Sequence, residues 1–183
     1  DMKKGQDLAM EYWNSLPSTK QKVKIFYDDS KSRPIDGTNA VQRFLSQGHK
    51  IFIISLSNVG MAVKSILKTA KALTFIDASN PGITKPPNKL LFRHSQTAFA
   101  EADIILKEAS KISTVKNIVL FYLNDDYGKS FQKSFESQNS SSSNIKYIPY
   151  ENTSPDLRTV AQTSGLDSKS SNTIVAVVGV GKP

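Results

Sequence analysis

The sequence predicts an α/β protein made of two lobes, each with a parallel sheet. Short apolar runs rich in β-branched and aromatic residues have the length of buried strands, and stretches with helical periodicity alternate with them. The six runs are 23–27, 50–56, 73–76, 118–123, 145–148 and 173–180. A loop with two prolines, 83–89, and a brief extended piece, 90–93, follow the third run. We therefore place the first lobe at residues 1–93 and the second at residues 94–183.

In the first lobe, helices are predicted from apolar residues at helical spacing. Gly5, Leu8, Ala9 and Tyr12 indicate an amphipathic helix that ends near Leu16. The same spacing indicates helices over 38–47 and 59–70. The second of these follows Ser57 and Asn58, which have the chemistry of an N-cap. The run 23–27 is predicted to be a strand, closed by a pair of aspartates.

The second lobe is predicted around the run 118–123, which is apolar throughout and is typical of a strand buried on both faces. Asp125, Asp126, Tyr127 and Gly128 end that run, and Phe131 and Phe135 lie four residues apart on the buried side of the helix that follows. Further helices are expected over 96–112 and 156–162. In open α/β sheets ligands bind beyond the carboxyl ends of the strands, so the turn at 125–128 is where ligand contacts are expected.

Composition excludes several classes of function. The chain of 183 residues has a net charge of +8, but its lysines are scattered over polar helix faces and no basic run is interleaved with aromatic residues. We therefore expect no nucleic-acid partner. The absence of cysteine rules out disulfides and thiolate metal sites, and the two histidines, His49 and His94, are too far apart for a recognisable metal cluster. No metal or cofactor is expected, and no apolar run approaches the roughly 20 residues of a membrane span.

Catalytic motifs are also missing from the sequence. It contains no G-x-S-x-G elbow, no P-loop and no G-x-G-x-x-G after a strand, so we expect no catalytic residues and no enzyme. Acids at strand ends, Asp28-Asp29 and Asp125-Asp126, also occur in phosphoryl-accepting receiver domains. Receivers need a further aspartate at the end of another strand, whereas the strand 50–56 ends in Ser55-Leu56. Capping is therefore the favoured role of these acids, and a receiver-like or flavodoxin-like enzyme domain ranks below a binding protein.

Short motifs recur in order along nearly the whole chain. They are Gly5-Gln-Asp-Leu-Ala9 with Asn14, the run 23–29 with its paired aspartates, Ser55-Leu-Ser-Asn58, Ala78-Ser-Asn-Pro81, Phe92-Arg-His-Ser95 and Asp125-Asp-Tyr-Gly128. Together they resemble the type I periplasmic binding proteins, which include branched-chain amino-acid-binding proteins of ABC transporters and the ligand-binding regions of related receptors. Each motif alone is weak, and the specificity comes from the ordered set.

The resemblance implies a fold and a function. It implies two Rossmann-like lobes joined by a hinge, truncated at both ends, with the leading strand of the first lobe missing and the second lobe incomplete. It also implies an extracytoplasmic solute-binding protein, periplasmic or extracellular and either free or lipid-anchored. Such a protein traps an amino acid or a similar small polar ligand and passes it to membrane transporter or receptor components.

The resemblance also implies ligand contacts at particular residues. Ser57 and Asn58 match a turn whose hydroxyl and backbone amides hold a ligand carboxylate. Asp77, Ala78 and Ser79 match the neighbouring turn, where backbone groups and a hydroxyl take an ammonium and a carboxylate. Tyr127 matches the tyrosine of the second lobe that closes over the ligand.

Some residues at these turns have a second interpretation. Ser57-Asn58 also reads as a helix N-cap, and Ser79 as part of a tight turn. Asp77 stands where the family usually has a small residue, and Ser55-Leu56 replaces its Gly-Pro. The acid at Asp77 favours a cationic ligand group if its side chain faces the ligand. The alternative function is a regulatory or structural module of the same fold that has a degenerate cleft and acts through protein partners.

Overall fold

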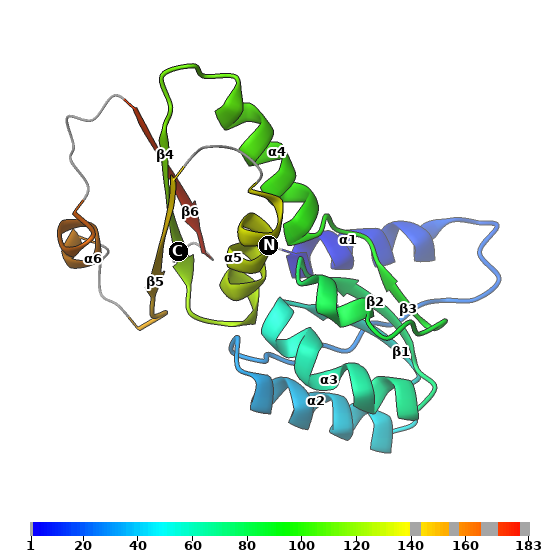
Figure 1. The fold of residues 1–183 in the computed structure, drawn as a ribbon. Helices are drawn as coiled ribbons and strands as arrows, with labels where there is room; N and C mark the ends of the chain where they lie inside the picture. Colours follow the sequence, from blue (N-terminus) through cyan, green and yellow to red (C-terminus); the bar gives the residue numbers. More distant parts are fainter. Residues whose placement is uncertain (1, 140–143, 154–157, 166–171, 180–183) are drawn as a thin grey trace.

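The chain folds around two parallel three-stranded sheets, as the computed structural model shows (Figure 1). The structure describes residues 2–139, 144–153, 158–165 and 172–179. The strand order is β1-β2-β3 in the first sheet and β5-β4-β6 in the second, and every described strand pair is parallel. The predicted architecture of two α/β lobes is therefore confirmed.

The first sheet is covered on one face by two helices. Its strands are β1 (Ile51–Ser55), β2 (Leu73–Asp77) and β3 (Leu91–Arg93), and its helices are α2 (Pro34–Ser46) and α3 (Ser57–Thr69), with a short 3-10 turn at Pro81–Thr84. Val63 and Leu67 of α3 are fully buried and pack with Ile76 of β2. The apolar stripe predicted for α3 is the face that covers the sheet. The predicted start of α2 at residue 38 was wrong, because Pro34 opens the helix, a position that suits proline.

The second sheet is built around β4, which is its central strand. The strands are β4 (Asn117–Leu123), β5 (Asn144–Tyr150) and β6 (Thr173–Val178), and the helices are α4 (Ala98–Ser110), α5 (Asp126–Gln138) and α6 (Arg158–Thr163). Every residue of β4 from Ile118 to Leu123 is buried, which confirms the prediction from its apolar run. Helices α4 and α5 lie on one face and α6 on the other (Figure 1). Part of the predicted helix 156–162 and the end of the predicted strand 173–180 lie outside the described residues.

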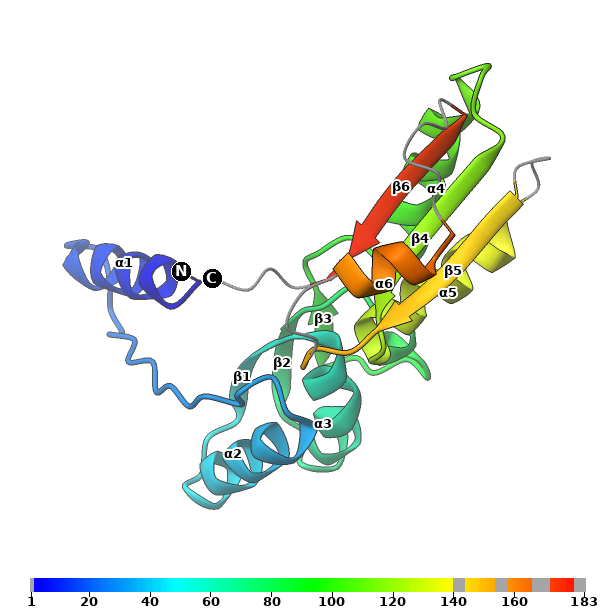
Figure 2. The ribbon, with the colours of Figure 1, turned by 90° about the vertical axis from the view of Figure 1, so that its left-hand side faces the viewer.

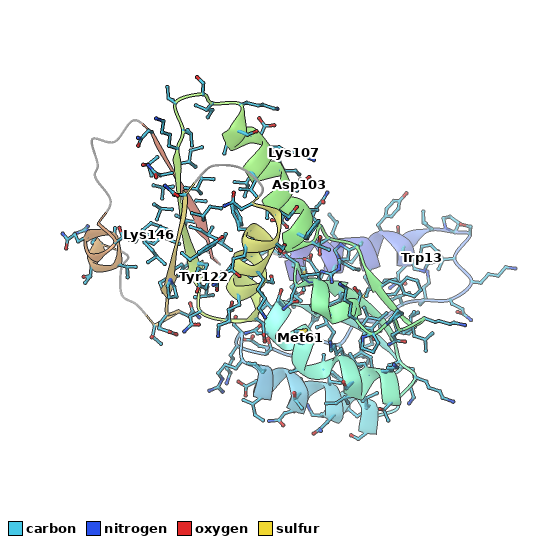
Figure 3. All side chains as sticks on the ribbon, in the orientation of Figure 1. Trp13, Met61, Asp103, Lys107, Tyr122 and Lys146 are labelled. Carbon is cyan, nitrogen blue, oxygen red and sulfur yellow. The ribbon has the colours of Figure 1, made fainter. Side chains whose placement is uncertain are left out.

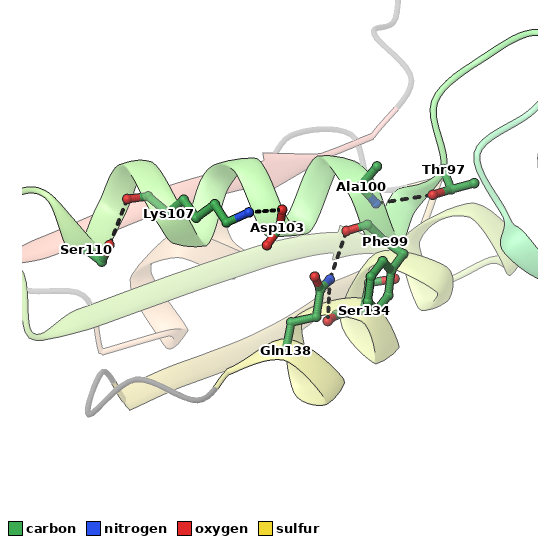
Figure 4. Close-up of polar contacts among 8 residues, drawn as sticks. All are labelled: Thr97, Phe99, Ala100, Asp103, Lys107, Ser110, Ser134 and Gln138. Carbon is green, nitrogen blue, oxygen red and sulfur yellow. Dashed lines mark hydrogen bonds and ion pairs between the residues drawn. The ribbon is translucent and has the colours of Figure 1, made fainter.

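Helices α4 and α5 pack against each other, and a side-chain hydrogen bond joins the beginning of α4 to the end of α5 (Figure 4). Thr97 caps α4, its Oγ1 accepting a hydrogen bond from the Ala100 N–H at 3.2 Å. At the end of α5, the Gln138 Nε2 donates to the Phe99 carbonyl at 2.8 Å. The outer side of α4 carries the exposed ion pair between Asp103 and Lys107 (Figure 3). The two helices form one layer, and α5 begins at the end of β4 because only two residues separate them in the chain.

The predicted strand at 23–27 was wrong. These residues are extended, but none of the described strands pairs with them. A groove of about 500 Å³ is lined on one side by 23–28 and on the other by β1, whose Ile51 is 68% exposed. An apolar run becomes a strand only when a neighbour takes its backbone hydrogen bonds, and that neighbour is not among the described residues. The missing leading strand stays a prediction.

The opening helix, α1 (Met2–Ser15), forms as predicted, but its apolar stripe is not buried. Leu8 and Tyr12 are 68% and 65% exposed, and the helix projects away from the sheets (Figure 2). Its beginning is held to the lobe by a hydrogen bond that the Tyr27 hydroxyl donates to Asp7 at 2.9 Å. The spacing of apolar residues shows that the helix is amphipathic, but it does not show which part of the protein packs against its apolar side. None of the described helices has the length and hydropathy to cross a membrane.

Candidate functional site

A cavity of about 340 Å³ lies between the carboxyl ends of the two sheets. Residues of both lobes form its walls. The two lobes meet beside it, where helix α3 of the first contacts helix α5 of the second. All the residues singled out from the sequence line it, namely Ser57, Asn58, Asp77, Ala78, Ser79 and Tyr127. The site therefore lies where the rule for parallel sheets places it, beyond the ends of β1, β2, β4 and β5.

The first wall is the turn from β1 into α3. The predicted N-cap was wrong by one residue: Leu56, with a φ of 74°, is the N-cap and makes no side-chain cap. Ser57 is buried, and its Oγ accepts from the Asn80 N–H at 3.2 Å. The Asn58 amide accepts from the Val59 N–H and donates to the Ser32 carbonyl at 2.7 Å. These two side chains hold neighbouring turns in place, so the groups that the turn offers to a ligand are the N–H groups of the first helical turn.

The second wall is the turn after β2, which Arg93 holds. Its guanidinium donates to the carbonyls of Ala78 and Asn80, the second at 2.7 Å, and burial lowers the pKa of Arg93. The Ala78 N–H donates to the Ser95 Oγ at 3.1 Å. By contrast, the Asp77 carboxylate and the Ser79 hydroxyl have no side-chain partner among the described residues. Both residues line the cavity.

The third wall is the start of α5 in the second lobe. Asp125 is the N-cap, and its Oδ1 accepts from the Gly128 N–H at 2.9 Å, so the predicted capping role is confirmed. Tyr127 is half-buried, with the edge of its ring against Phe131 at a centroid distance of 5.2 Å. Burial raises the pKa of the Tyr127 phenol, so it remains a hydroxyl at neutral pH. That hydroxyl has no partner among the described side chains.

Several residues that sequence reasoning missed complete the site. Asn80 joins the lobes, because its Nδ2 donates to the Asp126 carbonyl at 3.1 Å. Asn124 and Glu151 line the cavity beyond the ends of β4 and β5, and the Asn124 Nδ2 donates to the Glu151 Oε1 at 2.6 Å. Asn124 directly follows the predicted strand 118–123, which is the signal that could have found it, whereas Glu151 directly follows β5 only because the observed strand runs on to Tyr150. The described residues contain no group of three acidic or histidine side chains arranged to hold a metal ion.

The Asp125 carboxyl provides a pH test of this wall. Burial raises its pKa, an effect larger than the opposing hydrogen bonds from the backbone N–H groups of Gly128 and Tyr127. The folded protein therefore holds the Asp125 proton more tightly than the unfolded chain does. The stability that this supplies is fully present below the pKa of an unfolded aspartate, about 3.9. It is lost as the pH rises through the higher pKa of Asp125 in the folded protein. Asp125→Asn keeps an N-cap that cannot ionise, so its stability relative to the natural protein should increase over this pH interval.

The measurement is urea unfolding of both proteins over a pH series, with Glu11→Gln on α1 as the control for loss of a carboxylate on an exposed helix face. Only the difference between variant and natural protein matters, because other carboxyl groups titrate in both. A difference that stays flat, or that falls as the pH rises above about 3.9, would contradict the proposed burial of Asp125.

The fold is that of the type I periplasmic binding proteins, a conclusion that rests on solved structures. No family model matches the sequence, and no curated protein matches it significantly. A periplasmic binding protein from Burkholderia mallei superposes with a TM-score of 0.78 at 10% identity, over 97% of this chain and 48% of that one.

Two further matches were solved with ligands. One is the branched-chain amino acid transporter substrate-binding protein LivJ from Streptococcus pneumoniae, in complex with isoleucine, with a TM-score of 0.77, 20% identity and coverage of 90% of this chain and 49% of that one. The other is an ABC transporter solute-binding protein from Rhodopseudomonas palustris, in complex with 3,4-dihydroxybenzoic acid, with a TM-score of 0.74, 18% identity and coverage of 95% and 49%. This chain thus spans about half the length of these structures, and at such identities the likeness establishes the fold alone.

Proposed function

We propose that this protein is an extracytoplasmic solute-binding protein that traps an amino acid or a similar small polar ligand between its lobes. It performs no chemistry and hands its ligand, or its ligand-bound shape, to a membrane transporter or a sensor. The proposal places it in the periplasm or outside the cell. The single observation that supports it best is the cavity of about 340 Å³ whose walls come from both lobes.

The chemistry of the walls supports a small polar ligand. The first turn of α3 offers open N–H groups and the positive end of a helix dipole, which suits a carboxylate. Isoleucine and 3,4-dihydroxybenzoic acid, the ligands of two matched structures, both carry a carboxylate. The Tyr127 hydroxyl of the second lobe, and the Asp77 carboxylate at the end of β2 beside the first turn of α3, are available to polar groups of the ligand. We propose Ser57, Asn58, Asp77, Ala78, Ser79 and Tyr127 as its contacts.

The mechanism would be closure of the two lobes about the ligand. A ligand that touches both lobes binds the closed arrangement better than the open one, and it shifts the equilibrium by that difference in affinity. The contact between Asn80 and Asp126 lies where the lobes meet, so it would be made or lost as they move. A transporter or sensor would then read the closed form.

The test is ligand-induced thermal stabilisation with a panel of amino acids and small carboxylates. A ligand at 100 times its Kd should stabilise the protein by about 2.7 kcal/mol and raise its Tm. Tyr127→Ala should weaken binding by about tenfold or more, the equivalent of about 1.4 kcal/mol, because it removes the wall of the second lobe. Tyr147→Ala on β5 is the control, since that tyrosine packs in the second core and does not line the cavity.

A cavity that binds none of these ligands would overturn the proposal. The alternative is a module of the same fold that has lost its ligand and works through protein partners. Equal affinity in the natural protein and Tyr127→Ala, by contrast, would keep the solute-binding function and remove Tyr127 from its site.

A further inference from the structure

The cavity between the lobes has a charge opposite to that of the chain. The net charge of the protein is +8, yet the residues that line the cavity include Asp77, Asp125 and Glu151 and no lysine, arginine or histidine. All the charged side chains that line the cavity are therefore acidic. This observation bears on the charge of the ligand, which the fold leaves open.

The three acids come from different elements and from both lobes. Asp77 ends β2 in the first lobe, whereas Asp125 precedes α5 and Glu151 follows β5 in the second. One oxygen of Asp125 accepts from the Gly128 N–H, and one oxygen of Glu151 accepts from Asn124. The hydrogen bond from Asn124 uses only one oxygen of Glu151, and the Asp77 carboxylate has no side-chain partner among the described residues.

Closing the lobes on these acids is unfavourable without a counter-charge. A carboxylate removed from water costs free energy unless it is paired, and like charges repel more strongly as the surroundings become less polar. Burial already raises the pKa of the Asp125 carboxyl, and burial together with Asp125 raises the pKa of the nearby Tyr150 phenol. A cation between the lobes would pair with acids on both sides, so it would favour the closed arrangement more than a neutral ligand does.

We propose that the preferred ligand is an organic cation, an amino acid with a basic side chain or a related amine, and that Asp77 is the main determinant of this preference. The inference rests on the proposed solute-binding function and deepens it. An ammonium or guanidinium group can span acids that come from separate elements. A metal ion needs several ligands around one point, and the described acids are not grouped in that way.

The experiment is calorimetric binding of L-lysine, L-arginine, L-leucine and L-glutamate to the purified protein at neutral pH and low salt. We expect lysine or arginine to bind at least about tenfold more tightly than leucine, and glutamate most weakly. Raising the salt should weaken the binding of the basic amino acids more than that of leucine, because salt screens interactions between partly exposed charges.

Variants identify the residue responsible. Asp77→Asn keeps the shape of the side chain but removes its charge, so it should reduce the preference for lysine over leucine by about tenfold. Glu151→Gln should reduce the preference as well, and it serves if Asp77→Asn does not fold. Glu11→Gln makes the same change of charge on the exposed helix α1, away from the cavity, and should leave the preference unchanged.

The outcomes separate the two proposals. Leucine or glutamate binding as tightly as lysine would overturn the cation preference and leave the solute-binding function intact. A preference for lysine that neither Asp77→Asn nor Glu151→Gln reduces would also overturn it, because the acids would not be its cause. Failure of all four amino acids and of the wider ligand panel would overturn both proposals.

Discussion

Replacing Phe135 by alanine is expected to lower the free energy of unfolding by about 3–5 kcal/mol. The Phe135 side chain is fully buried in the core of the second lobe, one helical turn after the buried Phe131. Removing it leaves a cavity between α5 and the sheet that the rigid strand β4 cannot close. The measurement is urea or guanidinium unfolding, with the free energy extrapolated to water.

The matched control is Phe99→Ala on α4, since Phe99 is 50% exposed. The backbone carbonyl of Phe99 accepts the hydrogen bond from Gln138, so that contact survives the substitution. We expect the control to cost less than about 1 kcal/mol. Equal losses for the two variants would show that α5 does not pack as described.

Gly128→Ala is expected to have the second largest effect, a loss of about 3 kcal/mol that comes from overpacking. A Cβ at this position would lie 1.9 Å from the Leu123 carbonyl oxygen and 2.7 Å from the Leu123 nitrogen. Both are backbone atoms, which cannot rotate away as a side chain can. The start of α5 would have to move off the end of β4, taking Asp125 and Tyr127 with it, so ligand stabilisation should decrease together with fold stability.

Gly5→Ala makes the same substitution where there is room for it. No atom lies within 4 Å of the added Cβ, and Gly5 is within the exposed helix α1. Alanine is the better helix former, so this variant should keep or raise stability, by at most about 1 kcal/mol. Unfolding curves and ligand-induced Tm shifts of both variants provide the test. A Gly128→Ala protein as stable as the natural one would contradict the close approach of α5 to β4.

The second lobe shows how far sequence patterns reach. The run 118–123 predicted a doubly buried strand, and the spacing of Phe131 and Phe135 predicted the buried face of the next helix; both are confirmed. Asp125 was expected to cap, which it does, but it also lines the cavity. A carboxyl at a strand end can do both, because the turn that it caps also forms the wall of the cavity. The sequence analysis weighed capping against the role of a receiver-domain acid, and it expected ligand contacts at the turn 125–128.

The errors in the first lobe come from contacts between distant segments. Ser57 was expected to cap α3, but its hydroxyl accepts from the N–H of Asn80, 23 residues further along the chain. The run 23–27 has the composition of a strand, but none of the described strands pairs with it. The less apolar segment 91–93 becomes β3 because β2 lies beside it. Strand formation depends on the neighbour as much as on the run itself.

Local patterns in the sequence were thus sufficient for the α/β class and for the positions of most helices and strands, and the ordered motifs pointed to turns that line the cavity. These features depend on periodicity and on residues close together in the chain. Only the tertiary structure determined that 23–27 pairs with none of the described strands, that Arg93 and Asn80 hold the turns of the cavity, and that acids from both lobes line the same cavity. Those features depend on residues tens of positions apart, and their interaction energy exists only once the sheets have assembled.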